Sequence, residues 1–281
     1  KNVFISNIHY SNIISIFFLR KIANLKLIIF ERTSFKELDL FLSIPNFLKN
    51  RCIKFLLKPM YKKADQILTN SKVLSKELLK KGLKSKVVYS ATIKKIIPKK
   101  RFKKKLFFNL ISVGRLTHQK DYKTIIKSIK LVKRKNFKLK IYGNGNLKKS
   151  LENFVKINNL NNQIEILGHE KDKKKIYNNA DLLIHAAIFE GLPNNIVEAI
   201  NYSVPIIASK SAGGTAEILG NGKYGTLFET ENYKQLAKKI DDFLEDPSKL
   251  QKKVLKGRKE LIKFKFSNTT KNLERIINQL F

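Results

Sequence analysis

The second half of the chain alternates between two hydrophobic patterns. From about Phe107 onward, short runs of apolar, β-branched and aromatic residues end at Gly, Ser or Ala, as in FNLISVG, FKLKIYG, QIEILG, DLLIHAA and VPIIAS. Segments with apolar residues at helical spacing lie between them, as in YKTIIKSIKLVKRK, LKKSLENFVKINN, KKKIYNNA and NIVEAINY. Nearly unbroken apolar strands that alternate with helices are typical of a parallel sheet covered on both faces. The pattern therefore predicts a doubly wound α/β domain.

Residues 1–95 show a weaker version of the same alternation. The runs KNVFIS, KLIIF, ADQILT and SKVVYS indicate strands. We expect helices around 11–23, 47–63 and 73–82. Pro59 is expected to kink or end the second of these helices. Because only about four strands are indicated, and because the chain begins at Lys1 and not at Met, we expect the first lobe to be truncated.

Charge and proline mark the boundaries between these parts. The stretch IKKIIPKKRFKKK, residues 93–105, is highly basic and contains Pro98, which is typical of a linker. The last residues, SNTTKNLERIINQLF, indicate one more helix, capped at Ser267 or Asn268. The predicted division is a first lobe over 1–95, a linker over 96–106, a second lobe over 107–266 and a final helix over 267–281.

The composition excludes a disordered basic tail. Hydrophobic residues make up 43% of the chain, which is enough for a core in each lobe. The formal net charge of +36 attracts phosphates of any kind, whether in nucleotides, nucleic acid or anionic lipid. The lysines are scattered and accompanied by many Asn and Ile, a pattern that AT-rich codon usage also produces. The charge alone therefore does not select a partner.

The cysteine count, the spacing of the histidines and the hydropathy restrict the cellular compartment and the kinds of site that we expect. The single Cys52, which we expect in the core, excludes an intramolecular disulfide and fits a reducing cytosol. The four histidines lack zinc spacing. Charged residues interrupt the most apolar stretch, residues 12–30, which therefore lacks the about 20 apolar residues that span a bilayer. The segment PNFLKNRCIKFLLKPMYKKA, residues 45–64, is either a basic amphipathic helix on a membrane or a helix packed into the first lobe. We expect a cytoplasmic protein, at most peripheral on the inner face of the cytoplasmic membrane.

Three loops that follow predicted strands are candidates for ligand binding, because ligands of open α/β sheets bind beyond the carboxyl ends of the strands. SVGRLTHQKDY offers Gly114, Arg115 and Lys120 as a diphosphate clamp, although its two cations are also two of 58 basic residues. SAGGTAEIL offers a phosphate cradle or an ordinary tight turn. YGNGNLKK has Lys148 where a dinucleotide fingerprint requires its third glycine, so an NAD site is disfavoured.

The stretch FEGLPNNIVEAI places two glutamates eight positions apart. Pro193 is suited to the first turn of a helix, so Glu190 lies in the loop before it and Glu198 about two turns along. This separation would place Glu190 near a reacting centre and let Glu198 contact the sugar hydroxyls of a ligand. Two glutamates at this spacing also occur often by chance.

Taken in order, these motifs resemble a known family. GRLTHQKDY, YGNGNLKKSLE, ILGHEKDKKKIYNNADLLIHAAIFEGLPNNIVEAINYSVPIIASKSAGGTAEIL and NGKYGTLFE resemble the C-terminal half of the GT-B retaining glycosyltransferases of family 4, from about Phe107 to Leu244. ADQILTNSKVLSKELLKKG resembles that family's acceptor lobe, although its opening glycine-rich strand and loop are not present. The resemblance implies an α/β fold of two Rossmann-like, doubly wound lobes that face each other across a cleft, with a final helix that crosses back to the first lobe.

The resemblance also implies a role for each matched residue. Glu190 would hold the donor sugar or stabilise positive charge at its anomeric carbon, and Glu198 would bind the ribose. Arg115 and Lys120 would offset the charge of the leaving diphosphate, with Gly114 allowing close backbone approach. The remaining donor-binding residues would be Gly168 and His169 near the base, and Gly191, Leu192 and Pro193 near the phosphate or sugar. His9 is a candidate for the acceptor side, with a polar turn residue as the alternative. His118 is expected in a loop near the donor, and His185 at a strand end.

The implied reaction is transfer of a sugar from a nucleotide-sugar, with UDP the expected nucleotide, to a saccharide or lipid-linked acceptor in bacterial surface-polysaccharide synthesis. No Asp-x-Asp pair occurs, so we expect neither a metal nor another cofactor, with the basic pair supplying the electrostatic stabilisation.

Three alternatives stay open. A sugar-nucleotide 2-epimerase of the same fold would release UDP without an acceptor. A nucleic-acid-binding protein would explain the charge, but no helix-turn-helix, zinc or RNA-binding signature appears, and we expect no specific nucleic acid partner. A chain with a truncated first lobe would bind a donor and fail to transfer it.

Overall fold

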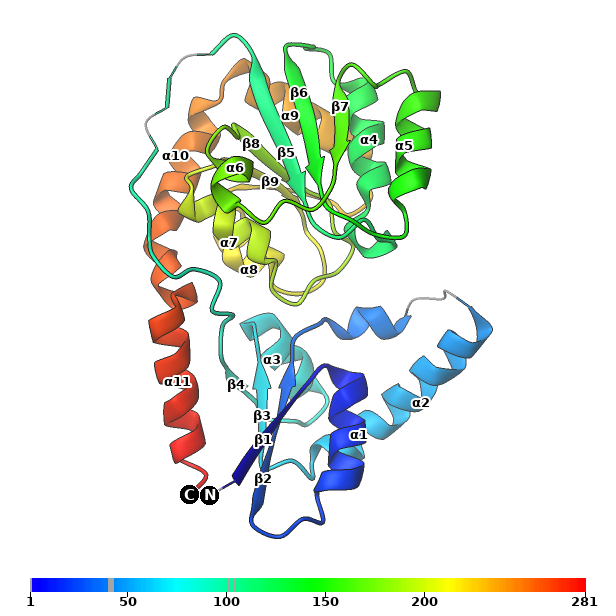
Figure 1. The fold of residues 1–281 in the computed structure, drawn as a ribbon, viewed down its shortest axis with the longest axis vertical. Helices are drawn as coiled ribbons and strands as arrows, with labels where there is room; N and C mark the ends of the chain where they lie inside the picture. The colour runs from blue at the N-terminus through cyan, green and yellow to red at the C-terminus, as the bar shows by residue number, and fades with distance from the viewer. Residues whose placement is uncertain (1, 40–42, 101, 104) are drawn as a thin grey trace.

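A computed structural model describes residues 2–39, 43–100, 102–103 and 105–281, and shows two lobes (Figure 1). The first lobe holds a parallel sheet in the order β1-β2-β3-β4. Its strands are β1 (Asn2–Asn7), β2 (Leu25–Glu31), β3 (Gln66–Thr69) and β4 (Lys86–Val87). Its helices are α1 (His9–Leu19), the 3₁₀ helix η1 (Phe35–Asp39), α2 (Ile44–Tyr61) and α3 (Lys72–Lys80). The four strands and three helices predicted from the apolar runs are confirmed.

Two residues of α2 refine the sequence-based picture. Pro59 lies inside the helix, which continues two residues further to Tyr61. The prediction that Cys52 is buried is wrong, since its side chain is exposed. Leu57, Met60 and Tyr61 form the buried side of α2, and Cys52 lies off that stripe because successive helical residues are rotated by about 100°.

The second lobe is a six-stranded parallel sheet in the order β10-β9-β8-β5-β6-β7. Its strands are β5 (Phe108–Val113), β6 (Phe137–Tyr142), β7 (Ile164–Leu167), β8 (Leu182–His185), β9 (Ile206–Ser209) and β10 (Thr226–Phe228). Its helices are the 3₁₀ helix η2 (His118–Lys120), α4 (Tyr122–Leu131), α5 (Lys148–Ile157), α6 (Lys173–Tyr177), α7 (Asn194–Asn201), α8 (Thr215–Ile218), the 3₁₀ helix η3 (Gly220–Gly222), α9 (Tyr233–Glu245) and α10 (Ser248–Gly257).

Alternate residues of the central strands enter two separate cores. Leu110 and Leu182 belong to the core under α4, α5 and α9, whereas Ile111 and Leu183 belong to the core under α6, α7 and α8. Such alternation places apolar side chains on both faces of the sheet, as its burial by helices on each side requires. The doubly wound domain predicted from the sequence is confirmed.

The last helices connect the two lobes. After the 3₁₀ helix η4 (Arg258–Phe264), α11 (Phe266–Asn278) runs along the first lobe, where Ile276 packs with Ile28, Leu68 and Val88 (Figure 1). The helix begins at Phe266, earlier than the predicted cap at Ser267 or Asn268. Lys265 is the last extended residue, because its backbone pairs with Ile93.

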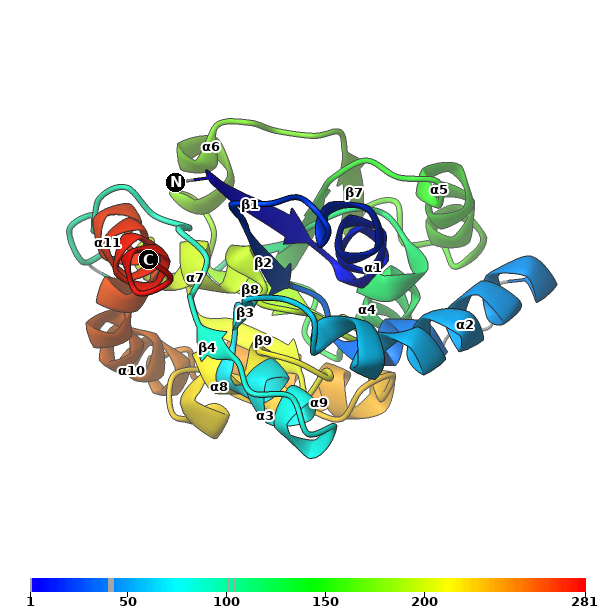
Figure 2. The same ribbon diagram turned by 90° about the horizontal axis from the view of Figure 1, so that it is seen from below.

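A carboxylate of the second lobe also binds the first. Glu217 in α8 accepts hydrogen bonds from the backbone N–H groups of Lys72 and Val73, each at 3.1 Å, and from the Tyr89 hydroxyl at 2.7 Å. Lys72 and Val73 open α3, whose unpaired N–H groups and dipole favour a negative charge at this end. Figure 1 shows α8 and α3 facing each other across the boundary between the lobes, and the two helices also lie close together in the view of Figure 2.

Candidate active site

The main candidate site lies where the strand order of the second lobe reverses. A cavity of about 640 Å³ opens beyond the carboxyl ends of β5 and β8, which are neighbours in the sheet although they are not consecutive in sequence. Open α/β sheets bind ligands at such a reversal, because the loops leaving the two strands diverge there. Its lining comprises Val113, Gly114, Arg115, Gln119, Lys120, Tyr142, Gly143, Asn144, His169, Glu170, Lys173, Glu190, Leu192, Pro193, Asn194, Asn195 and Glu198.

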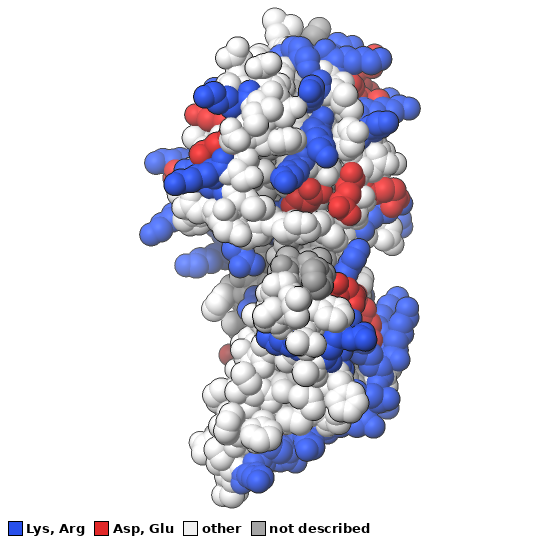
Figure 3. All heavy atoms as spheres, turned by 90° about the vertical axis from the view of Figure 1, so that its right-hand side faces the viewer, with Lys and Arg blue, Asp and Glu red and all other residues white. Residues whose placement is uncertain are grey.

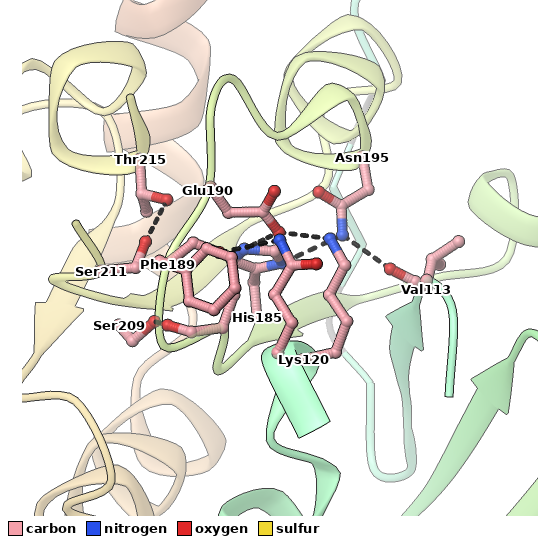
Figure 4. A network of polar contacts seen from close by, with 12 residues as sticks. Val113, Lys120, His185, Phe189, Glu190, Asn195, Ser209, Ser211 and Thr215 are labelled. Atoms are coloured by element: carbon pink, nitrogen blue, oxygen red, sulfur yellow. Dashed lines mark hydrogen bonds and ion pairs between the residues drawn. The ribbon is translucent and has the colours of Figure 1, made fainter. Parts of the chain in front are cut away.

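Glu190 and Lys120 form an ion pair in the wall of this cavity (Figure 4). Glu190 follows β8 by five residues and Lys120 ends η2, so the loops after both central strands contribute. The Glu190 side chain is 8% exposed and that of Lys120 is 15% exposed. Carboxylates and ammonium groups are buried at this level only when they are paired. The pair therefore places one negative and one positive group at fixed positions on the cavity.

His185 supports this pair from beneath. Its Nε2 lies 3.5 Å from Glu190 Oε1, and Asn195 Nδ2 contacts its Nδ1 at 3.1 Å and donates to the Val113 carbonyl at 2.7 Å (Figure 4). Because an amide nitrogen only donates, Nδ1 is the acceptor and the proton resides on Nε2, toward Glu190. Complete burial, with a smaller contribution from Lys120, holds the pKa of His185 well below its usual range. The imidazole is therefore neutral.

Close backbone contacts hold the loop that carries Glu190. The Glu190 N–H donates to the Ala212 carbonyl at 2.7 Å, and the Gln119 amide donates to the Phe189 carbonyl at 3.0 Å. Gly213 has a φ of +104°, and a Cβ there would lie 1.7 Å from the Glu190 carbonyl oxygen. The SAGGT turn thus packs against the Glu190 loop and does not line the cavity, and Ser211 and Thr215 contact each other at 2.6 Å (Figure 4).

Glu198 lies at another part of the same cavity. It belongs to α7, about one turn beyond Asn194, and accepts a hydrogen bond from the Tyr177 hydroxyl at 2.7 Å. Lys173 forms an ion pair with its other oxygen at 3.1 Å. Burial raises the pKa of Tyr177, and the Glu198 carboxylate raises it further, so the hydroxyl stays protonated and donates. Lys173 and Tyr177 have no distinguishing motif in the sequence, and only the packing of α6 against α7 reveals their role.

The loop after β5 supplies the other cation. Gly114 donates to the Tyr142 carbonyl at 3.0 Å, and a Cβ on Gly143 would lie 1.8 Å from the Gly114 carbonyl oxygen. The two loops are therefore in backbone contact, and Arg115 follows directly from this contact. Among the residues that the structure describes, no carboxylate lies within ion-pair distance of Arg115. Its guanidinium lines the cavity as a cation, and the Glu37 carboxylate of the first lobe is near enough to interact with it electrostatically.

The remaining candidates divide between this cavity and other positions. His169, Leu192 and Pro193 line it, whereas Gly168 does not and instead accepts a hydrogen bond from Gly143 at 3.2 Å. Gly191 faces the first lobe, since a Cβ there would lie 1.6 Å from the Arg32 carbonyl oxygen.

The other histidines lie apart from this cavity. His118 is in η2 and lines two smaller cavities nearby. His9 is a fully buried residue at the start of α1, and not an exposed turn residue.

Two kinds of feature are absent from the described residues. No group of three or more His, Cys, Asp or Glu residues is arranged to hold a metal ion in the part of the chain that is described. Of the helices seen there, none is both long and apolar enough to cross a bilayer.

Comparison with known proteins gives consistent similarities. The family described as glycosyl transferases group 1 matches residues 93–260, more than half of the chain. The N-acetylgalactosamine-N,N'-diacetylbacillosaminyl-diphospho-undecaprenol 4-alpha-N-acetylgalactosaminyltransferase of Campylobacter jejuni is 28% identical over 207 residues, which cover 71% of this chain and 56% of that protein. An amylovoran biosynthesis glycosyltransferase of Erwinia amylovora is 33% identical over 115 residues, 41% of this chain and 33% of that protein. The chain thus spans only about half of the first relative and a third of the second.

A solved structure extends the likeness to both lobes. The Anabaena protein HepE, solved in complex with UDP-glucose, superposes with a TM-score of 0.80 at 17% identity, over 99% of this chain and 79% of HepE. At this identity the likeness shows the fold alone. The two-lobed GT-B fold predicted from the sequence is confirmed.

Proposed function

Because the chain belongs to the family of glycosyl transferases group 1, we propose that it transfers a sugar from a UDP-sugar to a saccharide or lipid-linked acceptor. The observation that carries this proposal is the charge arrangement of the main cavity. Arg115 and Lys120 present cations, Glu190 presents a carboxylate beside Lys120, and Glu198 presents a second carboxylate elsewhere in the same cavity. A nucleotide-sugar needs these groups together, since it combines an anionic diphosphate with hydroxyl-bearing sugars at both ends.

Arg115 and Lys120 bind the diphosphate in this proposal. A lysine ammonium has three donors, so Lys120 contacts Glu190 with one and reaches phosphate oxygens with the others. Negative charge grows on the diphosphate as the bond to the sugar breaks, and fixed cations stabilise that charge without reorganisation. The two residues thus supply the electrostatic stabilisation that a divalent ion supplies elsewhere, and we propose transfer without a metal.

The two glutamates bind the two sugars of the donor. Glu190, held by Lys120 and His185, stabilises positive charge at the anomeric carbon, and Glu198 accepts hydrogen bonds from ribose hydroxyls. His169 and Glu170 lie where the base would bind. We propose retention of configuration by attack on the face that the leaving diphosphate departs from. In that step the acceptor oxygen bonds to the anomeric carbon and its proton passes to a diphosphate oxygen.

The named relatives support the substrate classes. The Anabaena protein was solved with UDP-glucose, and the names of two relatives refer to a diphospho-undecaprenol and to amylovoran biosynthesis. We therefore propose a role in bacterial surface-polysaccharide synthesis, with a saccharide or polyprenyl-linked acceptor.

The exposed residues of the first lobe support the proposal that the protein contacts an anionic membrane surface. Along α2, Leu48 and Phe55 are 59% and 81% exposed, and Lys49, Arg51 and Lys54 accompany them on the same helix. Figure 3 shows Lys and Arg side chains along the borders of this lobe. Apolar side chains among cations bind the interface of anionic bilayers. We propose peripheral association there, which would bring a lipid-linked acceptor to the cleft.

Donor turnover tests the proposal. The purified chain is incubated with UDP-glucose, UDP-N-acetylglucosamine or UDP-N-acetylgalactosamine and with octyl glycosides as acceptors, and NMR follows the anomeric signals. We expect acceptor-dependent UDP release and a product with the donor's anomeric configuration. Glu190→Gln should lower the rate by about a hundredfold. Glu152→Gln, which changes an exposed carboxylate of α5 that does not line this cavity, is the control and should retain most activity. Acceptor-independent release with an epimerised sugar would instead identify a 2-epimerase.

A further inference from the structure

A second large cavity lies in the first lobe, apart from the donor cavity. It has a volume of about 680 Å³, which is within the range of small-molecule sites. Its lining comes mainly from η1, α2 and α3, and Ala212 of the second lobe also contributes. None of the residues that line it in the described part of the chain also lines the donor cavity. The proposed transfer reaction therefore does not account for this space.

Lysines dominate the lining of this cavity. They are five of its twelve described lining residues, one from η1 and two each from α2 and α3: Lys36, Lys54, Lys58, Lys80 and Lys81. Lysine and arginine make up 58 of 281 residues in the whole chain, about half that share. A Cβ on Gly82 would lie 3.7 Å from the Lys58 ammonium nitrogen, so α2 and the end of α3 bring their cations together. The cavity is thus more basic than the composition of the chain alone produces.

Carboxylates offset only part of this charge. Asp39 and Glu77 also line the cavity; Asp39 forms an ion pair with Lys54, and Glu77 interacts electrostatically with the two lysines of α3. Lys36 and Lys58 have no carboxylate within ion-pair distance among the residues that the structure describes. Five lysines against two carboxylates leave an excess of three positive charges. A cleft lined by one sign of charge concentrates ions of the opposite sign, so this cavity attracts anions.

Buried apolar side chains form another part of the lining. Phe35, Leu38 and Leu57 are each at most 8% exposed and line the same space as the lysines. The Lys81 ammonium lies 5.6 Å from the centre of the Phe35 ring. Lysine ammonium groups bind phosphates as point charges, and an apolar wall accommodates a sugar ring or a base. Because an inorganic anion would leave that wall uncovered, the combination fits an organic phosphate.

Ala212 connects this cavity to the donor cavity. Its carbonyl accepts the Glu190 N–H at 2.7 Å, and its backbone pairs with Phe189. A Cβ on Gly191 would lie 1.6 Å from the carbonyl oxygen of Arg32, so the chain that leads into η1 touches the Glu190 loop. A ligand between η1 and Ala212 would hold both sides of this contact. It would thereby favour the arrangement of the lobes that places Glu190 at the donor cavity.

We propose that this second cavity binds a small organic phosphate, and that its occupancy strengthens nucleotide binding in the donor cavity. The binding goes beyond the proposed function and does not depend on it, whereas the coupling rests on the donor site. The lysines of η1, α2 and α3 hold the phosphate, and Phe35, Leu38 and Leu57 contact the body of the molecule. Because coupling between two sites is reciprocal, UDP strengthens binding of this ligand by the same factor.

Titration at saturating UDP tests the site, because UDP then blocks the donor cavity. The probes are fructose bisphosphate, ATP and inorganic pyrophosphate, each added to the full chain at physiological salt. We expect at least one organic phosphate to bind, and to bind more tightly than pyrophosphate, which cannot cover the apolar wall. Lys58→Gln/Lys80→Gln should weaken that binding about tenfold or more. Lys62→Gln/Lys76→Gln is the matched control and should bind as the wild type does, since it removes two exposed lysines of the same lobe that do not line the cavity.

Vesicles of phosphatidylcholine with and without phosphatidic acid are the second arm, in which a lipid headgroup supplies the phosphate. Binding that needs phosphatidic acid and is lost only in Lys58→Gln/Lys80→Gln would assign the cavity to a lipid. Binding of the soluble probes alone would assign it to a free metabolite. Absence of binding in both arms would overturn the site. Equal losses in the two double variants would also overturn it, because they would show only non-specific attraction to a basic protein.

The coupling is measured by titrating UDP with and without the soluble probe that binds most tightly. We expect the probe to lower the Kd for UDP by about threefold or more. Without the probe, the Kd for UDP should be the same in Lys58→Gln/Lys80→Gln and in the wild type. An unchanged Kd for UDP with the probe bound would refute the coupling through Ala212. Failure of UDP to bind, while the lysines still bind a probe, would instead refute the proposed donor site and leave the second cavity established.

Discussion

At the scale of single residues, the Lys120–Glu190 pair links the fold to the proposed chemistry. Both side chains are shielded from solvent, so their mutual attraction is stronger than that of a surface pair. His185 adds a neutral imidazole 3.5 Å from Glu190, because its burial prevents a second positive charge beside Lys120. The Glu190 carboxylate is therefore held at a defined position on the cavity. Positive charge that develops on a donor sugar next to Glu190 would be stabilised without any rearrangement of the site.

Removal of Lys120 should show how strongly the buried Glu190 carboxylate depends on its paired cation. Lys120→Met leaves a buried carboxylate without its cation, which costs about 3 kcal/mol of the free energy of unfolding. The double variant Lys120→Met/Glu190→Gln should recover most of that loss, since both charges are gone. Denaturant titration of the two single variants and the double variant measures the coupling. A double variant no more stable than Lys120→Met would contradict the description of the pair.

At the scale of elements, the site depends on loops that touch through glycines. The turn between β9 and α8 supports the Glu190 loop at Gly213, where there is no room for a side chain. Sequence patterns predicted the strands, because each buried strand is a short apolar run. They did not reveal this contact, since two glycines before a short helix fit a phosphate cradle and a packing turn equally well. Lys173 and Tyr177 were missed for a related reason: only tertiary packing brings α6 to Glu198.

A pair of glycine substitutions tests the contact. Gly213→Ala should lower turnover strongly, because its Cβ would meet the Glu190 carbonyl oxygen at 1.7 Å and displace the loop. Gly222→Ala is the matched control: its φ of +95° is similarly unfavourable for alanine, but nothing lies within 4 Å of the new Cβ. It should cost about 1 kcal/mol in stability and leave turnover intact. Equal activity losses in the two variants would show that backbone strain, and not displacement of Glu190, is responsible.

At the scale of the whole molecule, the contacts of Glu217 and the packing of the last helix hold the two lobes in one arrangement. Glu217 binds the first turn of α3, and α11 packs on the first lobe beyond it. The sequence predicted two lobes and a final helix, but not which residue links them. Considered alone, the motif that contains Glu217 suggests a phosphate cradle, and the partner segment of Glu217 is 144 residues away.

Glu217→Ala should loosen the contact between the lobes. Without the carboxylate, the N–H groups of Lys72 and Val73 lose their acceptor, so their hydrogen exchange should accelerate by about tenfold or more. Small-angle scattering should also give a larger radius of gyration. Glu274→Ala, in α11 and away from α3, serves as the control. Unchanged exchange at Lys72 and Val73 would mean that Glu217 does not hold the lobes together.

The proposed function depends above all on whether the main cavity binds a nucleoside diphosphate through its own residues. Calorimetric titration of the chain with UDP, GDP and ADP, with and without EDTA and beside Glu198→Gln, tests this most directly. We expect micromolar binding of UDP in preference to the other two, unaffected by EDTA and weakened about tenfold or more in the variant, since a charge-assisted hydrogen bond to ribose is lost. Equal binding of all three nucleotides that disappears as salt rises would show only non-specific attraction to a highly basic protein, and would contradict the assignment of the site.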